Sequence, residues 1–234
     1  NDFSVTETLP DYNALDSLGK SEQITFEVAR QAATLISPPV EELGDTLPSP
    51  PGRNDQIIFI TDTRLYQQCS TYCRQQYTIE TDSLANAVIR FYSGSGQVLP
   101  GNLASYSFGD LAEMLSVGSG VVQIENDLRS AEWIVFLMSD VNPSEPSSDA
   151  LRTFLDQRPD LQQNKNIIVF ALAAPYYLDT TDISKLTAYY ALYSRSNTFI
   201  EVAARLLFHE IQPSGDLPVT VQGISYDLIE ITSP

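Results

Sequence analysis

Three short runs of apolar residues stand out along the chain, at 56–60, 133–138 and 167–172. None of them alternates between apolar and polar positions, and unbroken apolar runs of this length are typical of strands that are covered on both faces of a sheet. Polar residues follow the first two runs closely, among them Asp62 and Asp140. The pattern predicts three buried strands in the middle of a parallel sheet.

Segments with helical periodicity lie between and after these runs. We expect helices at about 64–77, 83–92, 109–116, 121–131, 147–157 and 198–211. Two weaker strands are expected at 187–193 and 217–221, the second at a sheet edge because it contains a proline. Strands that alternate with helices predict an α/β fold, a three-layer sandwich of the Rossmann or flavodoxin-like kind with a mainly parallel sheet and helices on both faces.

The amino-terminal part of the chain is organised differently. Residues 1–20 are polar and show no clear periodicity, so we expect a linker or a strap from a preceding domain, and a single α/β domain over 21–234. The chain starts without Met or an apolar signal core, as a trimmed or processed chain does. A helix is expected over 22–36, because four apolar residues recur there at helical spacing: Ile24, Val28, Ala32 and Leu35.

The net charge of the chain disfavours two classes of partner. Thirteen basic and 30 acidic residues give a formal net charge of −17, which disfavours nucleic acid and anionic membrane surfaces. No stretch approaches the roughly 18 consecutive apolar residues of a membrane span. We therefore expect a protein that binds no nucleic acid and does not span a membrane.

Polar and aromatic residues follow the predicted strands and form the candidate binding site. Ligands of open parallel sheets bind beyond the carboxyl ends of the strands. The candidates at these ends are Asp62, Arg64, Asp140, Asn142, Tyr176 and Tyr177. Such a set suits a sugar or another small ligand, and it suits ordinary loop ends or a domain interface equally well.

The residues needed for nucleophilic catalysis or for dinucleotide binding are missing from the sequence. The only histidine, His209, falls with Glu201 and Arg205 on one side of the expected helix over 198–211. This spacing indicates a solvated stripe with a Glu-Arg pair. With no other histidine, a Ser-His-Asp or Cys-His mechanism would lack a base. The pairs Gly94-Gly96 and Gly118-Gly120 do not fit a dinucleotide fingerprint, so no cofactor is expected.

Two cysteines, Cys69 and Cys73, lie four residues apart. On a helix they would share one face near disulfide range, so the pair is compatible with a disulfide and with two free thiols. Together with one histidine they are too few for a structural zinc site, and no metal site is expected. A disulfide would favour an extracytoplasmic or secreted protein, and the cellular location stays open.

The order of several segments in the last third of the chain is similar to a known family. After the apolar run at 167–172 come Ala174-Pro175-Tyr176-Tyr177-Leu178, an aromatic strand at 189–193, a helix with 203–208, and the closing segment Pro213-Ser214-Gly215-Asp216-Leu217-Pro218-Val219. This order resembles the end of the C-terminal domain of bacterial family 3 glycoside hydrolases, particularly the β-N-acetylhexosaminidase-like branch. The segments at 29–33 and 47–48 look like the start of the same domain.

The resemblance places catalysis outside this chain. It implies that the nucleophilic Asp, and in this branch the general acid/base, lie on a β/α barrel that would precede Asn1. The β-glucosidase-like branch takes a Glu from the second domain, but no Glu here matches by motif, and Tyr177 stands where the family has an Asp. We therefore expect no catalytic residue in this chain.

Two functions follow from these observations. The resemblance implies a non-catalytic accessory domain that packs on the barrel of a protein hydrolysing β-linked sugars, such as N-acetylglucosaminides. The residues at the strand ends leave the alternative of a module that binds carbohydrate or another small ligand.

Overall fold

A six-stranded sheet forms the centre of the computed structural model, which describes residues 20–47, 49–66, 74–117 and 122–217. The strand order is β1-β8-β7-β6-β2-β5. The strands are β1 (Thr34–Ser37), β2 (Ile57–Thr61), β5 (Leu103–Ser107), β6 (Trp133–Met138), β7 (Asn166–Ala171) and β8 (Ala188–Ala191). All neighbours pair in parallel except β1, which runs antiparallel to β8. This arrangement confirms the predicted α/β class.

The three unbroken apolar runs form β2, β6 and β7, next to one another in the sheet. Successive side chains of a strand point to opposite faces. Phe59 and Val135 accordingly join one buried cluster, and Ile60 and Phe136 join the other. Because both faces are covered, each of these strands needs apolar residues at every position, and the runs carry no alternation.

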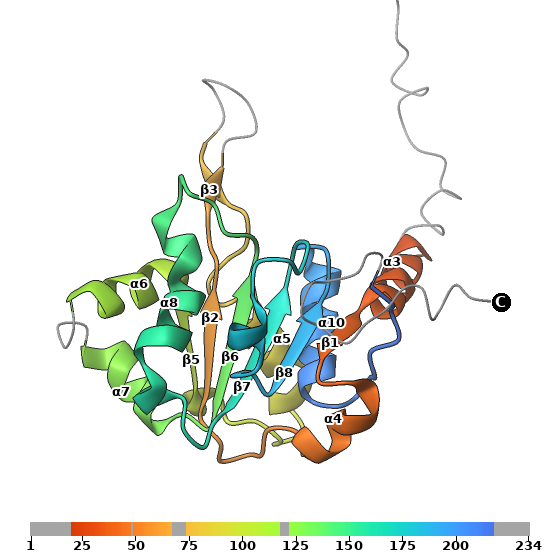
Figure 1. The fold of residues 1–234 in the computed structure, drawn as a ribbon. Coiled ribbons are helices and arrows are strands. Elements are labelled where there is room, and N and C mark those ends of the chain that lie inside the picture. The colour runs from red at the N-terminus through yellow and green to blue at the C-terminus, as the bar shows by residue number, and fades with distance from the viewer. Residues whose placement is uncertain (1–19, 48, 67–73, 118–121, 218–234) are drawn as a thin grey trace, which may run out of the picture.

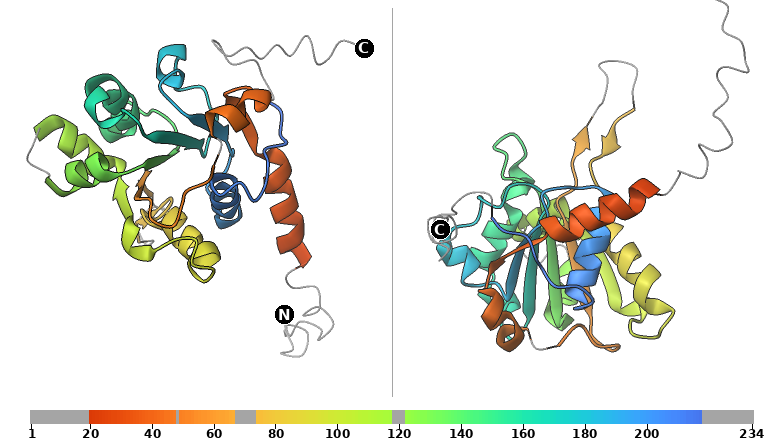
Figure 2. Two further views of the ribbon diagram at one scale, coloured as in Figure 1. Left: turned by 90° about the horizontal axis from the view of Figure 1, so that it is seen from below. Right: turned by 90° about the vertical axis from the view of Figure 1, so that its right-hand side faces the viewer.

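Helices cover both faces of the sheet, as Figures 1 and 2 show. One face packs against α3 (Lys20–Ala32), α5 (Ser83–Val88) and α10 (Asn197–Leu207). The opposite face packs against α6 (Phe108–Val117), α7 (Val122–Ser130), α8 (Ala150–Gln157) and α9 (Thr180–Ile183). The short helix α4 (Val40–Thr46) lies near the amino ends of the parallel strands. A π-helical turn continues α5, and three 3₁₀ turns complete the helical elements: Ile89–Ser93, Pro100–Asn102, Pro146–Asp149 and Pro159–Leu161.

Two of the predicted helices are wrong in part. The helix expected over 22–36 ends at Ala32, and the next residues form the edge strand β1, in which Leu35 pairs with Tyr190. Ile24 and Val28 are 66% and 57% exposed, because α3 packs on the sheet through Ala29 and Ala33 instead.

The helix expected over 64–77 is also wrong in its described parts. These form an antiparallel hairpin of β3 (Leu65–Tyr66) and β4 (Gln76–Tyr77), in which the β-favouring Tyr77 pairs with Leu65 and Tyr66 pairs with Gln76. The edge strand β5 was not expected, because its sequence Leu-Ala-Ser-Tyr-Ser is only partly buried and lacks an apolar run.

Several expectations lie outside the described residues. These are the linker at 1–20 except its last residue, both cysteines, the pair Gly118-Gly120, and the strand at 217–221 except Leu217. The remaining predicted helices at 83–92, 109–116, 121–131, 147–157 and 198–211 correspond to observed ones with shifted ends.

The closing segment of the described chain lies against β1. The backbone N–H groups of Ser214 and Gly215 donate to the Ala33 carbonyl oxygen at 3.1 and 2.9 Å. A Cβ atom at Gly215 would lie 2.6 Å from the Ala32 carbonyl oxygen and 2.7 Å from the Thr34 hydroxyl oxygen. Only glycine allows this approach, and it brings Leu217 to a position where it is 1% exposed.

Candidate functional site

A cluster of charged residues joins the carboxyl ends of β2 and β6. Because Thr61 pairs with Leu137, the residues that follow the two strands meet at one edge of the sheet. Arg64 donates from Nε to Asp62 Oδ1 at 3.0 Å and from Nη2 to Asp62 Oδ2 at 2.6 Å. The same guanidinium donates to the carboxylate and to the carbonyl oxygen of Asp140. We call Asp62, Arg64 and Asp140 the strand-end cluster.

This buried cluster holds the segment after β2 and the segment after β6 together. Asp62 and Arg64 have side chains that are 2% and 13% exposed, whereas Asp140 is 34% exposed. Burial alone would lower the pKa of Arg64, but hydrogen bonds and charges from Asp62 and Asp140 outweigh it and raise that pKa. Arg64 therefore keeps its charge, and a buried carboxylate is paired by a bidentate contact.

Backbone hydrogen bonds complete this connection at Asp62. Its carboxylate accepts a hydrogen bond from the Ser139 N–H at 3.2 Å, and its own N–H donates to the Leu137 carbonyl oxygen at 2.9 Å. Thr78, just after β4, donates its N–H to the Arg64 carbonyl oxygen at 2.8 Å. The strand-end cluster thus fixes the base of the β3–β4 hairpin.

Arg195 belongs to the same site and was missed by the sequence interpretation. Its guanidinium lies 3.9 Å from the Asp140 carboxylate, on the loop that follows β8. The rule that selected Asp62 and Asp140, polar residues after a parallel strand, would also have selected Arg195. With it the site holds two positive and two negative charges, so it offers no net charge to an ionic ligand.

The other three predicted residues do not enter this cluster. The Asn142 N–H donates to the Ser148 hydroxyl at 2.8 Å, and its Oδ1 accepts from the Ser144 N–H at 3.0 Å, which closes a local turn. Tyr176 and Tyr177 follow β7 and are 45% and 36% exposed. No hydrogen bond among the described residues joins these tyrosines to the strand-end cluster. Ligand binding by any of the six residues stays a prediction.

Exposed apolar side chains occur at two places along the same edge of the sheet, on the hairpin and after β7. The hairpin extends beyond the carboxyl ends of the strands, as Figure 2 shows, and it exposes Leu65, Tyr66 and Tyr77 by 52%, 39% and 51%. Tyr176 and Tyr177 follow a parallel strand and so belong to this edge too. These five make up most of the large apolar side chains that are exposed in the described part of the chain. We call them the edge surface.

His209 lies beyond its expected helix. The helix α10 ends at Leu207, and His209 follows in a left-handed conformation with φ of 56°. Glu201 pairs with Arg90, and Arg205 pairs with Glu210, so the expected pair between Glu201 and Arg205 is not formed. The prediction of a shared helical stripe is wrong because the helix stops two residues before the histidine.

The described ranges contain neither a cluster of metal ligands nor a helix that could span a membrane. Within 20–47, 49–66, 74–117 and 122–217, no three His, Cys, Asp or Glu residues gather so as to hold a metal ion. No helix of these ranges has the length and apolar character needed to cross a bilayer.

Known proteins resemble this chain in structure but not in sequence. The sequence matches no family model, and no curated protein matches it. Solved structures do match. The chain has the fold of one part of family 3 glycoside hydrolases.

Three of these structures show the extent of the likeness. A fungal multi-domain β-N-acetylglucosaminidase of family 3 matches 93% of this chain at 15% identity with a TM-score of 0.55. A family 3 β-N-acetylglucosaminidase from a Paenibacillus strain matches 94% at 12% identity with a TM-score of 0.52. β-Glucosidase 3B from Thermotoga neapolitana matches 88% at 14% identity with a TM-score of 0.54.

The matched region is only part of each of those proteins. The chain spans 21%, 36% and 31% of their respective lengths. At these identities the likeness concerns the fold, and the fold does not by itself carry an activity.

Proposed function

We propose that this chain is a non-catalytic accessory domain of a family 3 glycoside hydrolase, and that it packs on a β/α barrel of the same protein. The observation that carries the proposal is the uneven coverage: nearly all of this chain matches, but only about a third or less of two of its structural neighbours. The order of motifs from the Pro175-Tyr176 turn to Gly215 points the same way. The chemistry of the whole protein would be hydrolysis of β-linked sugars.

The edge surface is the best candidate for the contact with the barrel. Apolar side chains exposed together on a domain mark a surface that another domain can cover. Tyrosine is enriched in such interfaces because its ring is apolar and its hydroxyl can still find a partner. The strand-end cluster holds the hairpin in place, so little ordering would be needed when Leu65, Tyr66 and Tyr77 are covered.

The test uses the longer protein that carries this chain, with a charge placed on the edge surface. We expect Tyr66→Asp and Tyr77→Asp to lower hydrolysis of nitrophenyl β-glycosides severalfold or to lower the melting temperature, because a carboxylate would be buried in the interface. Ile24→Asp on α3 is the matched control, since Ile24 is 66% exposed and lies outside the edge surface. Equal effects of all three substitutions would count against this contact.

The isolated chain gives a second result that bears on the proposal. Residues 20–234 alone are expected to release no nitrophenol from the same substrates. Release of nitrophenol that disappears on substitution of Asp62 or Asp140 by Asn would refute the non-catalytic assignment.

The alternative is a carbohydrate-binding module, which two exposed tyrosines at the end of β7 favour. Sugar rings stack on exposed aromatic faces, and Asp140 and Asn142 could supply hydrogen bonds from the neighbouring strand end. Ligand binding to the folded state raises the melting temperature. A panel of β-linked saccharides that leaves this temperature unchanged, in the chain and in Tyr176→Ala alike, would exclude the alternative.

A further inference from the structure

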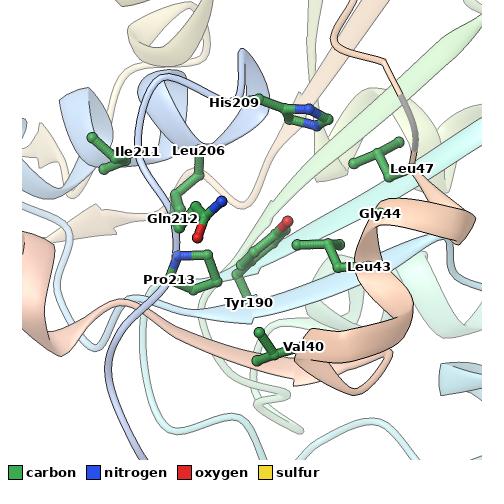
Figure 3. A pocket seen from close by; sticks show the side chains of 10 residues that line it. All are labelled: Val40, Leu43, Gly44, Leu47, Tyr190, Leu206, His209, Ile211, Gln212 and Pro213. Carbon is green, nitrogen blue, oxygen red and sulfur yellow. The ribbon is translucent and has the colours of Figure 1, made fainter.

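A cavity of about 170 Å³ lies under α4, near the amino ends of the parallel strands and away from the strand-end cluster. Leu43 and Leu47 of the α4 region form one wall, and Leu206 of α10 and Ile211 of the segment after this helix form the opposite one (Figure 3). The aromatic ring of Tyr190, from β8, lies between them. These walls are apolar, and the pocket opens to solvent where Val40 is 59% exposed and His209 and Gln212 are exposed.

Three uncharged polar groups line this cavity. The Tyr190 hydroxyl extends into it, and the imidazole of His209 and the carboxamide of Gln212 lie around it (Figure 3). Tyr190 as a whole is only 2% exposed. Burial raises the pKa of Tyr190 and lowers the pKa of His209, so both side chains are neutral at pH 7. Lysine and arginine are absent from the residues described as lining the cavity.

Two residues that border the cavity are unfavourable for their local backbone conformation. His209 has φ of 56° immediately after α10, where glycine is the favoured residue because it has no Cβ. Gly44 lies inside α4, although a Cβ there would meet nothing within 4 Å. Glycine inside a helix lowers stability relative to alanine. Departures of this kind concentrate at functional sites.

We propose that this cavity binds one uncharged six-membered aromatic ring that carries a hydroxyl group, a ligand of the phenol class. Its volume is close to the roughly 150 Å³ of an apolar cavity that holds benzene. The apolar walls suit an aromatic ring, and the polar groups beside them suit its single hydroxyl. The ring hydroxyl would exchange hydrogen bonds with Tyr190, His209 or Gln212.

The charge of the site decides against acidic ligands. The lining offers no cation, the imidazole is neutral, and the whole chain carries a formal charge of −17. A carboxylate or phosphate would therefore gain no counter-charge there. This assignment is independent of the accessory role, because the cavity and the edge surface lie at different ends of the sheet.

Phenol itself is the probe, and the single histidine is the reporter. The His209 Cε1 proton gives one isolated resonance, which we expect to shift saturably when phenol is added to the chain, with a dissociation constant on the order of 1 mM. Toluene, which lacks the hydroxyl, should bind about fivefold more weakly, the equivalent of one hydrogen bond. N-acetyltyrosinamide tests whether a tyrosine side chain of another protein can supply the same ring.

Substitutions separate binding from folding. Gly44→Leu should fill the cavity and abolish the shift, whereas Gly94→Leu, at another glycine with open space around it, should leave the shift intact. Tyr190→Phe should weaken phenol binding about fivefold. His209→Gly should weaken binding, followed by saturation transfer to phenol, without lowering the melting temperature, because glycine accepts the positive φ.

Two results would overturn the proposal. One is a His209 resonance that does not respond to phenol up to its solubility limit. The other is a response that persists unchanged in the folded Gly44→Leu chain, because the ring would then be bound elsewhere.

Discussion

At the scale of single residues, Gly215 shows how closely the end of the described chain is fitted to its surroundings. Two backbone N–H groups of this segment share the Ala33 carbonyl oxygen, and the space for a side chain is taken by backbone. The motif that resembles the family ending therefore has a physical cause: glycine lets the chain pass β1 closely enough to bury Leu217.

Replacing Gly215 tests this reading directly. We expect Gly215→Ala to lower the free energy of unfolding by about 1–3 kcal/mol, because the methyl group would meet the Ala32 carbonyl oxygen at 2.6 Å. Gly94→Ala is the control, since a Cβ there meets nothing within 4 Å. Urea titration of both variants measures the difference, and equal midpoints would show that the segment yields without cost.

At the scale of elements, strands buried on both faces were predicted from the sequence, whereas strands at the edges of the sheet were predicted less well or not at all. The strands β2, β6 and β7 were predictable because both of their faces are covered, so every position is apolar. β5 and β1 lie at the edges of the sheet, where burial is one-sided or depends on contacts from distant residues. The hairpin β3–β4 was mistaken for a helix because Leu65 and Tyr66 pair with Tyr77 and Gln76, and such pairing across strands leaves no signal in the helical spacing of apolar residues.

The candidate site was predictable to a similar extent. A parallel sheet brings its carboxyl strand ends together, so Asp62 and Asp140 could be paired from the order of the strands alone. The bidentate contact of Arg64 and the arrival of Arg195 depend on loop conformation. The cavity under α4 could not be foreseen. It lies between residues 40–47 and residues 206–213, and the first of these segments follows the edge strand β1, which was not expected from the sequence.

The strand-end cluster links two of these elements and gives a prediction at this scale. Arg64→Met should lower the free energy of unfolding by about 3 kcal/mol, because Asp62 would stay buried without its partner. Arg195→Met should cost no more than about 1 kcal/mol, since its contact to Asp140 is longer and more exposed. Adding Asp62→Asn to Arg64→Met should recover part of the loss. Chemical denaturation gives all three differences from the unsubstituted chain, and similar costs for the two single variants would contradict a structural role of the Arg64–Asp62 pair.

At the scale of the whole molecule, the two ends of one sheet carry different features. The carboxyl ends carry the strand-end cluster and the exposed edge surface, which we assign to contact with a barrel. The amino ends carry the cavity under α4, which we assign to a small aromatic ligand. The fold itself is shared with part of family 3 glycoside hydrolases, and the role within a larger protein is the central claim.

Hydrogen–deuterium exchange tests that claim most directly, by comparing this chain alone with the longer protein that contains it. We expect the backbone amides of the hairpin at 64–66 and 74–78, and those of the loop at 173–178, to exchange at least tenfold more slowly in the longer protein. Amides of α7, on the far side of the domain, should exchange equally in both. Unchanged exchange throughout the hairpin and the loop, or protection confined to other surfaces, would contradict the account.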